Sequence, residues 1–214
     1  MGANLGRRVP NPEGLLALLG GLPPAPPLQT LDLAIDEQET HTRKLVEYAT
    51  EAGERVQAFL LVPRKLDRLA PGVLAIHQDG GARPYTFGKS EPAGVGGDPE
   101  LAYGRELCER GYVVLCPDRF GFESRGLANS VDAERFASFR IFKEDGLELT
   151  EDLWLGSVAN RLLFQGHVPL GRTLFELRRA VDVLSAQPAV DPARIRVIGH
   201  SAGGFYGITG FYLT

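Results

Sequence analysis

The feature that most constrains this chain is a serine set between two glycines. It lies in the segment 193–207, which reads A-R-I-R-V-I-G-H-S-A-G-G-F-Y-G. An apolar and β-branched run, Ile195 to Ile198, leads directly into Gly199-His200-Ser201-Ala202-Gly203, and a glycine-rich apolar segment follows. The first run is typical of a buried strand, and the glycines favour a sharp turn. The segment therefore predicts a strand, a turn and a helix, with Ser201 at the apex.

A serine at such an apex can act as a nucleophile. The strained turn holds its hydroxyl clear of the sheet, and a side chain at Gly199 or Gly203 would collide with the backbone of the reversing chain. The N–H of Ala202, at the expected helix start, points to where an oxyanion would form. Ser201 is therefore the predicted nucleophile, next to His200. The alternative is an ordinary N-cap serine in a glycine-rich turn.

Length and composition restrict the class of protein. The chain has 214 residues, of which 43% are hydrophobic and 23% charged, with a net charge of −4. These values are typical of a globular protein with one sizeable core, and they offer no basic surface for nucleic acid. No run approaches the roughly 18 apolar residues of a membrane span, and the first ten residues lack an apolar signal core. We expect a cytoplasmic protein that binds neither nucleic acid nor membranes, and its oligomeric state stays open.

The cysteines and histidines do not predict a metal site. Cys108 and Cys116 are expected to be two buried free thiols, with a disulfide between them as the alternative. No Cys/His cluster has the spacing of zinc ligands. Acyl transfer at a serine needs no cofactor, so we expect none.

The remaining patterns predict an alternation of strands and helices. A hairpin is expected from Arg43–Tyr48 and Arg55–Val62, with a turn at 51–54. Val73 to Ile76 is apolar throughout, as in a strand buried on both faces of a parallel sheet. A helix capped by Asp98 is then expected to end near Arg110, and a strand should follow over Tyr112–Cys116. A second helix is expected to begin with a capping box at Thr173 and Glu176 and to end at Gln187-Pro188.

The turn after Val73–Ile76 is the second part of the expected site. It reads His77-Gln78-Asp79-Gly80-Gly81. In open α/β sheets ligands bind beyond the carboxyl ends of the strands, so this turn is well placed to supply a second oxyanion donor. The N–H of Asp79 is the first candidate and that of Gln78 the next. His77 either lines the site or packs at the strand end and hydrogen-bonds the loop. Arg119, in the turn after Tyr112–Cys116, is a further site-lining candidate.

The chain divides into an extension at 1–40 and a domain at 41–214. Within the domain, residues 127–168 depart from the alternation and carry many aromatic and leucine side chains among charges. We expect short helices that pass over the carboxyl edge of the sheet. They form either a lid or acyl pocket, or a peripheral subdomain that buries its own apolar side chains.

Three segments resemble the α/β-hydrolase superfamily, and more narrowly its dienelactone hydrolase and acetyl xylan esterase branches. They are A-I-H-Q-D-G-G, E-L-C-E-R-G-Y-V-V-L-C-P-D-R-F-G-F-E-S-R-G and R-R-A-V-D-V-L-S-A-Q-P-A-V-D-P-A-R-I-R-V-I-G-H-S-A-G-G, in family order between about residues 55 and 210. The resemblance implies a three-layer fold with a mostly parallel sheet and an amino-terminal hairpin. It also implies a serine hydrolase that acts on carboxylic esters, with Ser201 as the nucleophile that forms the acyl-enzyme. Dienelactone hydrolases proper carry a cysteine at the nucleophile elbow, so Ser201 favours the esterases.

One part of the family pattern is absent. In this fold the catalytic acid and histidine follow the serine along the chain, whereas no histidine follows Ser201 here. The four histidines are His41, His77, His167 and His200. We therefore expect the chain to be the amino-terminal part of a hydrolase, truncated after the nucleophile elbow. One alternative is a degenerate, non-catalytic hydrolase fold that binds a small ligand or a protein partner. Another is a split enzyme, in which a second chain completes the site.

Overall fold

The computed structural model describes residues 11–80, 85–138 and 150–212. In this part of the chain, strands form one six-stranded sheet in the order β1-β2-β3-β5-β4-β6. The strands are β1 (Leu31–Glu37), β2 (His41–Ala49), β3 (Arg55–Pro63), β4 (Ala70–Ile76), β5 (Val113–Pro117) and β6 (Val190–Gly199). The helices are α1 (Pro12–Leu18), α2 (Tyr103–Glu109), α3 (Ala133–Phe136), α4 (Thr150–Phe164), α5 (Pro169–Ser185) and α6 (Ala202–Tyr212).

The sheet is mixed. β4 pairs in parallel with β5 on one side and β6 on the other, whereas the pairs β1–β2, β2–β3 and β3–β5 are antiparallel. The expected hairpin is confirmed as β2 and β3, which pair from His41 opposite Pro63 to Ala49 opposite Arg55. The parallel part is therefore smaller than expected, because the first three strands are joined by short connections that reverse the chain.

The strand β1 was not predicted, and it lies inside the segment assigned to the extension 1–40. The strand pairs with β2 at the edge of the sheet, and all of its residues are exposed. Its sequence L-D-L-A-I-D-E places larger apolar residues at every second position, with Asp32 and Asp36 at positions between them. That alternation is a strand signal, and it could have revealed the element.

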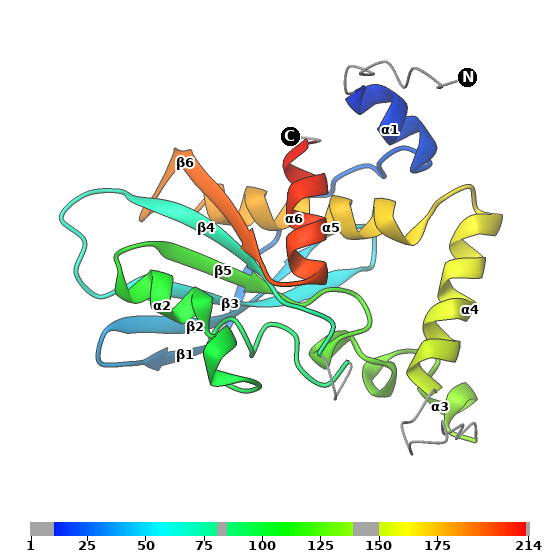
Figure 1. The fold of residues 1–214 in the computed structure, drawn as a ribbon, viewed down its shortest axis with the longest axis horizontal. Helices are drawn as coiled ribbons and strands as arrows, with labels where there is room; N and C mark the ends of the chain where they lie inside the picture. Colours follow the sequence, from blue (N-terminus) through cyan, green and yellow to red (C-terminus); the bar gives the residue numbers. More distant parts are fainter. Residues whose placement is uncertain (1–10, 81–84, 139–149, 213–214) are drawn as a thin grey trace, which may run out of the picture.

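Helices cover both faces of the sheet, which makes three layers. In Figure 1, α5 and α6 lie on one face of the sheet and α2 lies on the other. The side chains of β4 point alternately to the two faces of the sheet. Leu74 and Ile76 pack in the core with α5, whereas Val73 and Ala75 pack in the core with α2. All four side chains are buried. The prediction that this strand is buried on both faces is confirmed.

Two predicted helices differ in detail. Asp98 does accept a hydrogen bond from the N–H of Glu100 (2.9 Å), but it caps a short 3-10 helix (Pro99–Leu101) that is separate from α2. The first turn of α2, just after the break between the two helices, is closely packed. A Cβ on Gly104 would lie 2.6 Å from the carbonyl oxygen of Pro92. The capping box at Thr173 was wrong. α5 begins four residues earlier, at Pro169, and the carboxylate of Glu176 pairs with Arg125 (2.6 Å) and Arg172 (3.0 Å) instead.

The segment 127–168 contains one long helix rather than only short ones. The long helix is α4, and residues 139–149 of this segment lie outside the described residues. A small apolar cluster of Leu127, Trp154 and Val158 joins α4 to the turn after β5. Cys108 and Cys116, on α2 and β5, are both buried and free. The expectation of two buried thiols is confirmed.

Candidate active site

Ser201 lies at a sharp turn between β6 and α6. β6 ends at Gly199, α6 begins at Ala202, and Ser201 adopts a φ of +51°. This is the left-handed region, which costs a non-glycine residue roughly 1–3 kcal/mol, and functional sites are where such strain concentrates. The residue is exposed, and its hydroxyl makes no hydrogen bond to any residue that the structure describes. The serine is thus presented at the end of the sheet.

The two glycines that flank Ser201 leave room for close backbone packing. A Cβ on Gly199 would lie 2.3 Å from the carbonyl carbon of Gly203. A Cβ on Gly203 would lie 2.1 Å from the carbonyl oxygen of Ile76 and 2.7 Å from that of His77. The first turn of α6 therefore packs directly on the end of β4. This brings the turn after β4 next to Ser201 and Ala202.

His77 directly follows β4, and its side chain is fully buried. Its Nδ1 donates to the carbonyl oxygen of Gln78 (2.6 Å), and its Nε2 accepts the N–H of Arg119 (3.1 Å). Burial, with the nearby Arg119 cation, lowers the pKa of His77 to about 3, so the imidazole is neutral at physiological pH. Of the two interpretations kept for His77, these contacts favour the histidine that packs and hydrogen-bonds the loop.

Arg119 connects three elements around this turn. Its guanidinium donates to the carbonyl oxygen of Gln78 (3.0 Å) and pairs with the carboxylate of Asp79. It also stacks on Phe122 and Tyr206, 4.5 and 4.8 Å from the two ring centroids. The side chain of Arg119 is only 6% exposed, whereas that of Asp79 is 61% exposed. The side-chain amide of Gln78 points elsewhere and donates to Glu91 (3.2 Å).

The backbone N–H groups expected as oxyanion donors make no hydrogen bond within the described part of the chain. Among the residues that the structure describes, neither Asp79 nor Ala202 donates its N–H to an acceptor. Ala202 is the first residue of α6, and the first N–H groups of a helix have no intrahelical partner. Within the described residues, both groups are therefore available to bind an anion.

A cavity of about 380 Å³ opens beside this turn. Its wall combines Asp79 and Arg119 with Tyr206 from α6 and with one side of α4. The α4 residues are Leu155, Gly156, Val158, Ala159 and Leu162. Ser201 is outside this lining, five residues before Tyr206. Segment 127–168 thus contributes to the wall of the cavity and also buries its own apolar cluster.

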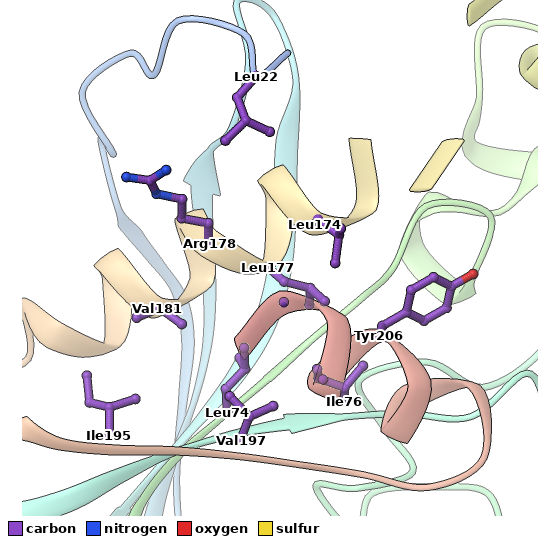
Figure 2. A pocket seen from close by; sticks show the side chains of 12 residues that line it. Leu22, Leu74, Ile76, Leu174, Leu177, Arg178, Val181, Ile195, Val197 and Tyr206 are labelled. Atoms are coloured by element: carbon purple, nitrogen blue, oxygen red, sulfur yellow. The ribbon is translucent and has the colours of Figure 1, made fainter. Parts of the chain in front are cut away.

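A second cavity, of about 150 Å³, lies under α6 (Figure 2). Apolar side chains from β4, β6 and α5 surround it, with Leu22 above and Tyr206 at one side, and Arg178 is its charged member. None of the predicted site residues lines it. We therefore place the candidate site at the first cavity.

The histidines do not supply a base to Ser201 within the described residues. His41 is buried at the start of β2 and contacts the hydroxyl of Thr40 (2.9 Å). The backbone N–H of His167 bonds to Leu162 (2.9 Å), after α4. His200 is exposed beside Ser201, without a hydrogen bond to it. In the same residues no group of three or more His, Cys, Asp or Glu could hold a metal ion.

Two features of the site escaped the sequence analysis. Tyr206 lines both cavities and stacks on Arg119, but nothing in the pattern of α6 distinguishes it from a core aromatic. The other is a buried charge cluster in which Lys89 binds Asp118 (2.8 Å) and Glu123 (2.7 Å). It ties the loop before α2 to the turn after β5. The acidic residues of the turn were visible in the sequence, but their lysine partner, about 30 positions away, was not.

Comparisons with known proteins agree with this fold. The chain is 31% identical over 194 residues to a protein of Bacillus subtilis (strain 168) named "Putative hydrolase YtaP", covering 89% of this chain and 55% of that protein. A solved structure described as a putative acetyl xylan esterase from Bacteroides fragilis NCTC 9343 matches with a TM-score of 0.71 at 16% identity, over 95% of this chain and 49% of the other. The chain thus spans about half the length of these relatives.

A third match points the same way. The glucuronoyl esterase from Solibacter usitatus matches with a TM-score of 0.54 at 18% identity, over 93% of this chain and 54% of the other. No protein-family model matches the chain. No helix in the described residues is long and apolar enough to cross a membrane. The strand order, the turn at Ser201 and these neighbours agree: the chain has the α/β-hydrolase fold.

Proposed function

We propose that this chain carries the nucleophile of a serine hydrolase that acts on small carboxylic esters through an acyl-enzyme at Ser201. The observation that carries the proposal is the left-handed backbone of Ser201 (φ +51°) at the turn from β6 to α6. The names of the structural neighbours, two esterases, support the same reaction class.

The proposed reaction has two steps. The hydroxyl oxygen of Ser201 attacks the ester carbonyl carbon, its proton passes to a base, and the alcohol leaves with a proton. Water then hydrolyses the acyl-enzyme, which releases the acid and restores the hydroxyl. We expect the N–H groups of Ala202 and Asp79, which make no hydrogen bond within the described residues, to stabilise the negative charge on the carbonyl oxygen in both steps. Gln78 is the reserve candidate for the second donor.

No base for Ser201 lies among its described neighbours. This observation favours the second candidate function, a non-catalytic binding protein. A fluorophosphonate probe separates the two functions, because it reacts much faster with an activated serine than with an ordinary one. We expect the complete natural protein to be labelled at Ser201 and to hydrolyse p-nitrophenyl acetate. Ser201→Ala should abolish both, whereas Ser185→Ala, at the end of α5, should leave both unchanged. Turnover that survives Ser201→Ala would refute the proposal.

We propose a cytoplasmic enzyme whose partner is its ester substrate alone. The net charge of −4 supports the expectation that the chain does not bind nucleic acid.

A further inference from the structure

The peptide between Gln78 and Asp79 is held from its carbonyl side. The carbonyl oxygen of Gln78 accepts two hydrogen bonds, from Nδ1 of His77 (2.6 Å) and from Nη2 of Arg119 (3.0 Å). A peptide bond is planar, and in the trans form its C=O and N–H point in opposite directions. Fixing the direction of this carbonyl therefore also fixes the direction of the N–H of Asp79.

That N–H belongs to the edge where the proposed chemistry takes place. The backbone of Ile76 and His77 touches the first turn of α6 at Gly203, one residue after Ala202. The N–H of Asp79 has no acceptor among the described residues, so it is available. A donor is effective in stabilising an oxyanion only when it is oriented in advance, because reorientation during the reaction would cost free energy.

The side chain of Arg119 contacts this peptide at two points and is itself held between two aromatic rings. Its guanidinium binds both parts of the dipeptide, the carbonyl of Gln78 and the carboxylate of Asp79, as a planar cation with several donors can. Stacking between Phe122 and Tyr206 limits the freedom of the guanidinium. The backbone N–H of Arg119 also donates to Nε2 of His77 (3.1 Å). This hydrogen bond orients the imidazole, which is the other donor to the carbonyl. Both hydrogen bonds on the carbonyl therefore depend on residue 119.

We propose that Arg119 is a positioning residue, which orients the Gln78–Asp79 peptide so that the N–H of Asp79 faces the oxyanion formed at Ser201. The inference rests on the proposed function. Arg119 does not touch the reacting atoms in this role. It acts through the peptide, and removing its side chain should slow the chemical step more than it weakens substrate binding.

A double-mutant cycle in the complete protein tests this role. Arg119→Met removes the donors and keeps most of the stem, whereas Asp79→Pro removes the N–H itself. If Arg119 acts only through that N–H, Arg119→Met should lower kcat for p-nitrophenyl acetate about 10- to 100-fold with little change in KM, and should have little further effect in the Asp79→Pro background. Asp79→Asn keeps the N–H, so Arg119→Met should still lower kcat in the Asp79→Asn background.

Controls separate positioning from stability. Arg110→Met removes an exposed arginine of the same charge from the end of α2 and should leave kcat unchanged. Thermal unfolding of every variant shows which ones are folded. If Arg119→Met does not fold, Arg119→Lys, which keeps the buried cation and its aliphatic stem, takes its place in the same cycle.

Each result of the cycle either supports or overturns the role of Arg119. Wild-type kcat in Arg119→Met, or an equal loss with and without the N–H of residue 79, overturns the inference while the labelling of Ser201 by a fluorophosphonate still stands. An unlabelled Ser201 overturns the proposed function, and the inference falls with it. A loss of kcat confined to the background that retains the N–H supports both.

Discussion

At the scale of single residues, the contact between α6 and the end of β4 depends on glycine at position 203. Gly203→Ala should force the helix away from the carbonyl of Ile76, because the new Cβ would lie 2.1 Å from that oxygen. We expect a loss of about 1–3 kcal/mol of unfolding free energy, as in overpacked cores. Gly210→Ala is the matched control in the same helix. Its Cβ would meet Leu174 at an ordinary 3.7 Å, and alanine favours helices, so stability should stay or rise by up to about 1 kcal/mol. Urea unfolding measures both, and equal effects would contradict the prediction.

His77 makes a second prediction at this scale, a dependence of stability on pH. Its pKa is about 3 in the folded protein and near 6.5 when unfolded, so the unfolded chain binds the extra proton as the pH falls below 6.5. Stability should therefore fall on acidification, by about 2 kcal/mol from this residue between pH 6.5 and pH 5. In His77→Asn that part of the loss should disappear, while His41, whose pKa is also lowered by burial, contributes equally to both proteins. Urea unfolding at the two pH values tests it, and equal losses in the two proteins would count against it.

At the scale of elements, buried charges join the loop before α2 to the turn after β5. Lys89 is 6% exposed and Asp118 is fully buried, and the Lys89 ammonium also binds Glu123, whose φ is +44°. Asp118 accepts two further hydrogen bonds from Ser124, through its N–H (3.2 Å) and its hydroxyl. Burial raises the pKa of Asp118, so its charge depends on these partners. Arg119 follows Asp118 directly, and the cluster therefore supports the residue that holds the Gln78–Asp79 peptide.

Lys89→Met should open this connection. It leaves the carboxylate of Asp118 buried without its cation, which typically costs about 3–5 kcal/mol. The loss should be smaller at pH 5 than at pH 7, because a protonated Asp118 carries no buried charge. Lys44→Met breaks an exposed pair with Asp32 and should cost less than about 1 kcal/mol. Urea unfolding gives the energies, and hydrogen exchange should show faster exchange at residues 85–97 in Lys89→Met alone. Similar losses in the two variants would refute the special role of the buried pair.

Local patterns predicted the elements whose stability is local. The run Val73–Ile76, the hairpin of β2 and β3, and the turn at Ser201 are all defined by neighbours in the sequence, and the structure places them accordingly. The start of α5 was missed because Glu176, which looks like a capping residue, is used by two arginines, one of them, Arg125, 51 positions away. For the same reason the contacts of Arg119 could not be foreseen. They join β4, β5 and α6, which only the folded sheet brings together.

At the scale of the whole molecule, β6 forms one edge of the sheet, and exposed apolar side chains lie beside it. Ile198 on this strand and Ile208 on α6 line an open groove of about 430 Å³, and Ile208 is 77% exposed. An uncovered edge strand beside exposed apolar side chains favours association between copies. We predict that the 214-residue chain associates as its concentration rises. Ile208→Lys should weaken that association, because it places a charge in the groove.

Val131→Lys is the matched control for this prediction. Val131 is fully exposed but lies just before α3, away from the sheet edge, and isolated surface hydrophobics of this kind have little effect. Size-exclusion chromatography with light scattering should show a smaller mass for Ile208→Lys than for the wild type at the same concentration, and no change for Val131→Lys. A wild-type chain that remains a 23.2 kDa monomer at high concentration would contradict the prediction. An equal effect of the two substitutions would show instead that net charge, rather than the edge of β6, controls association.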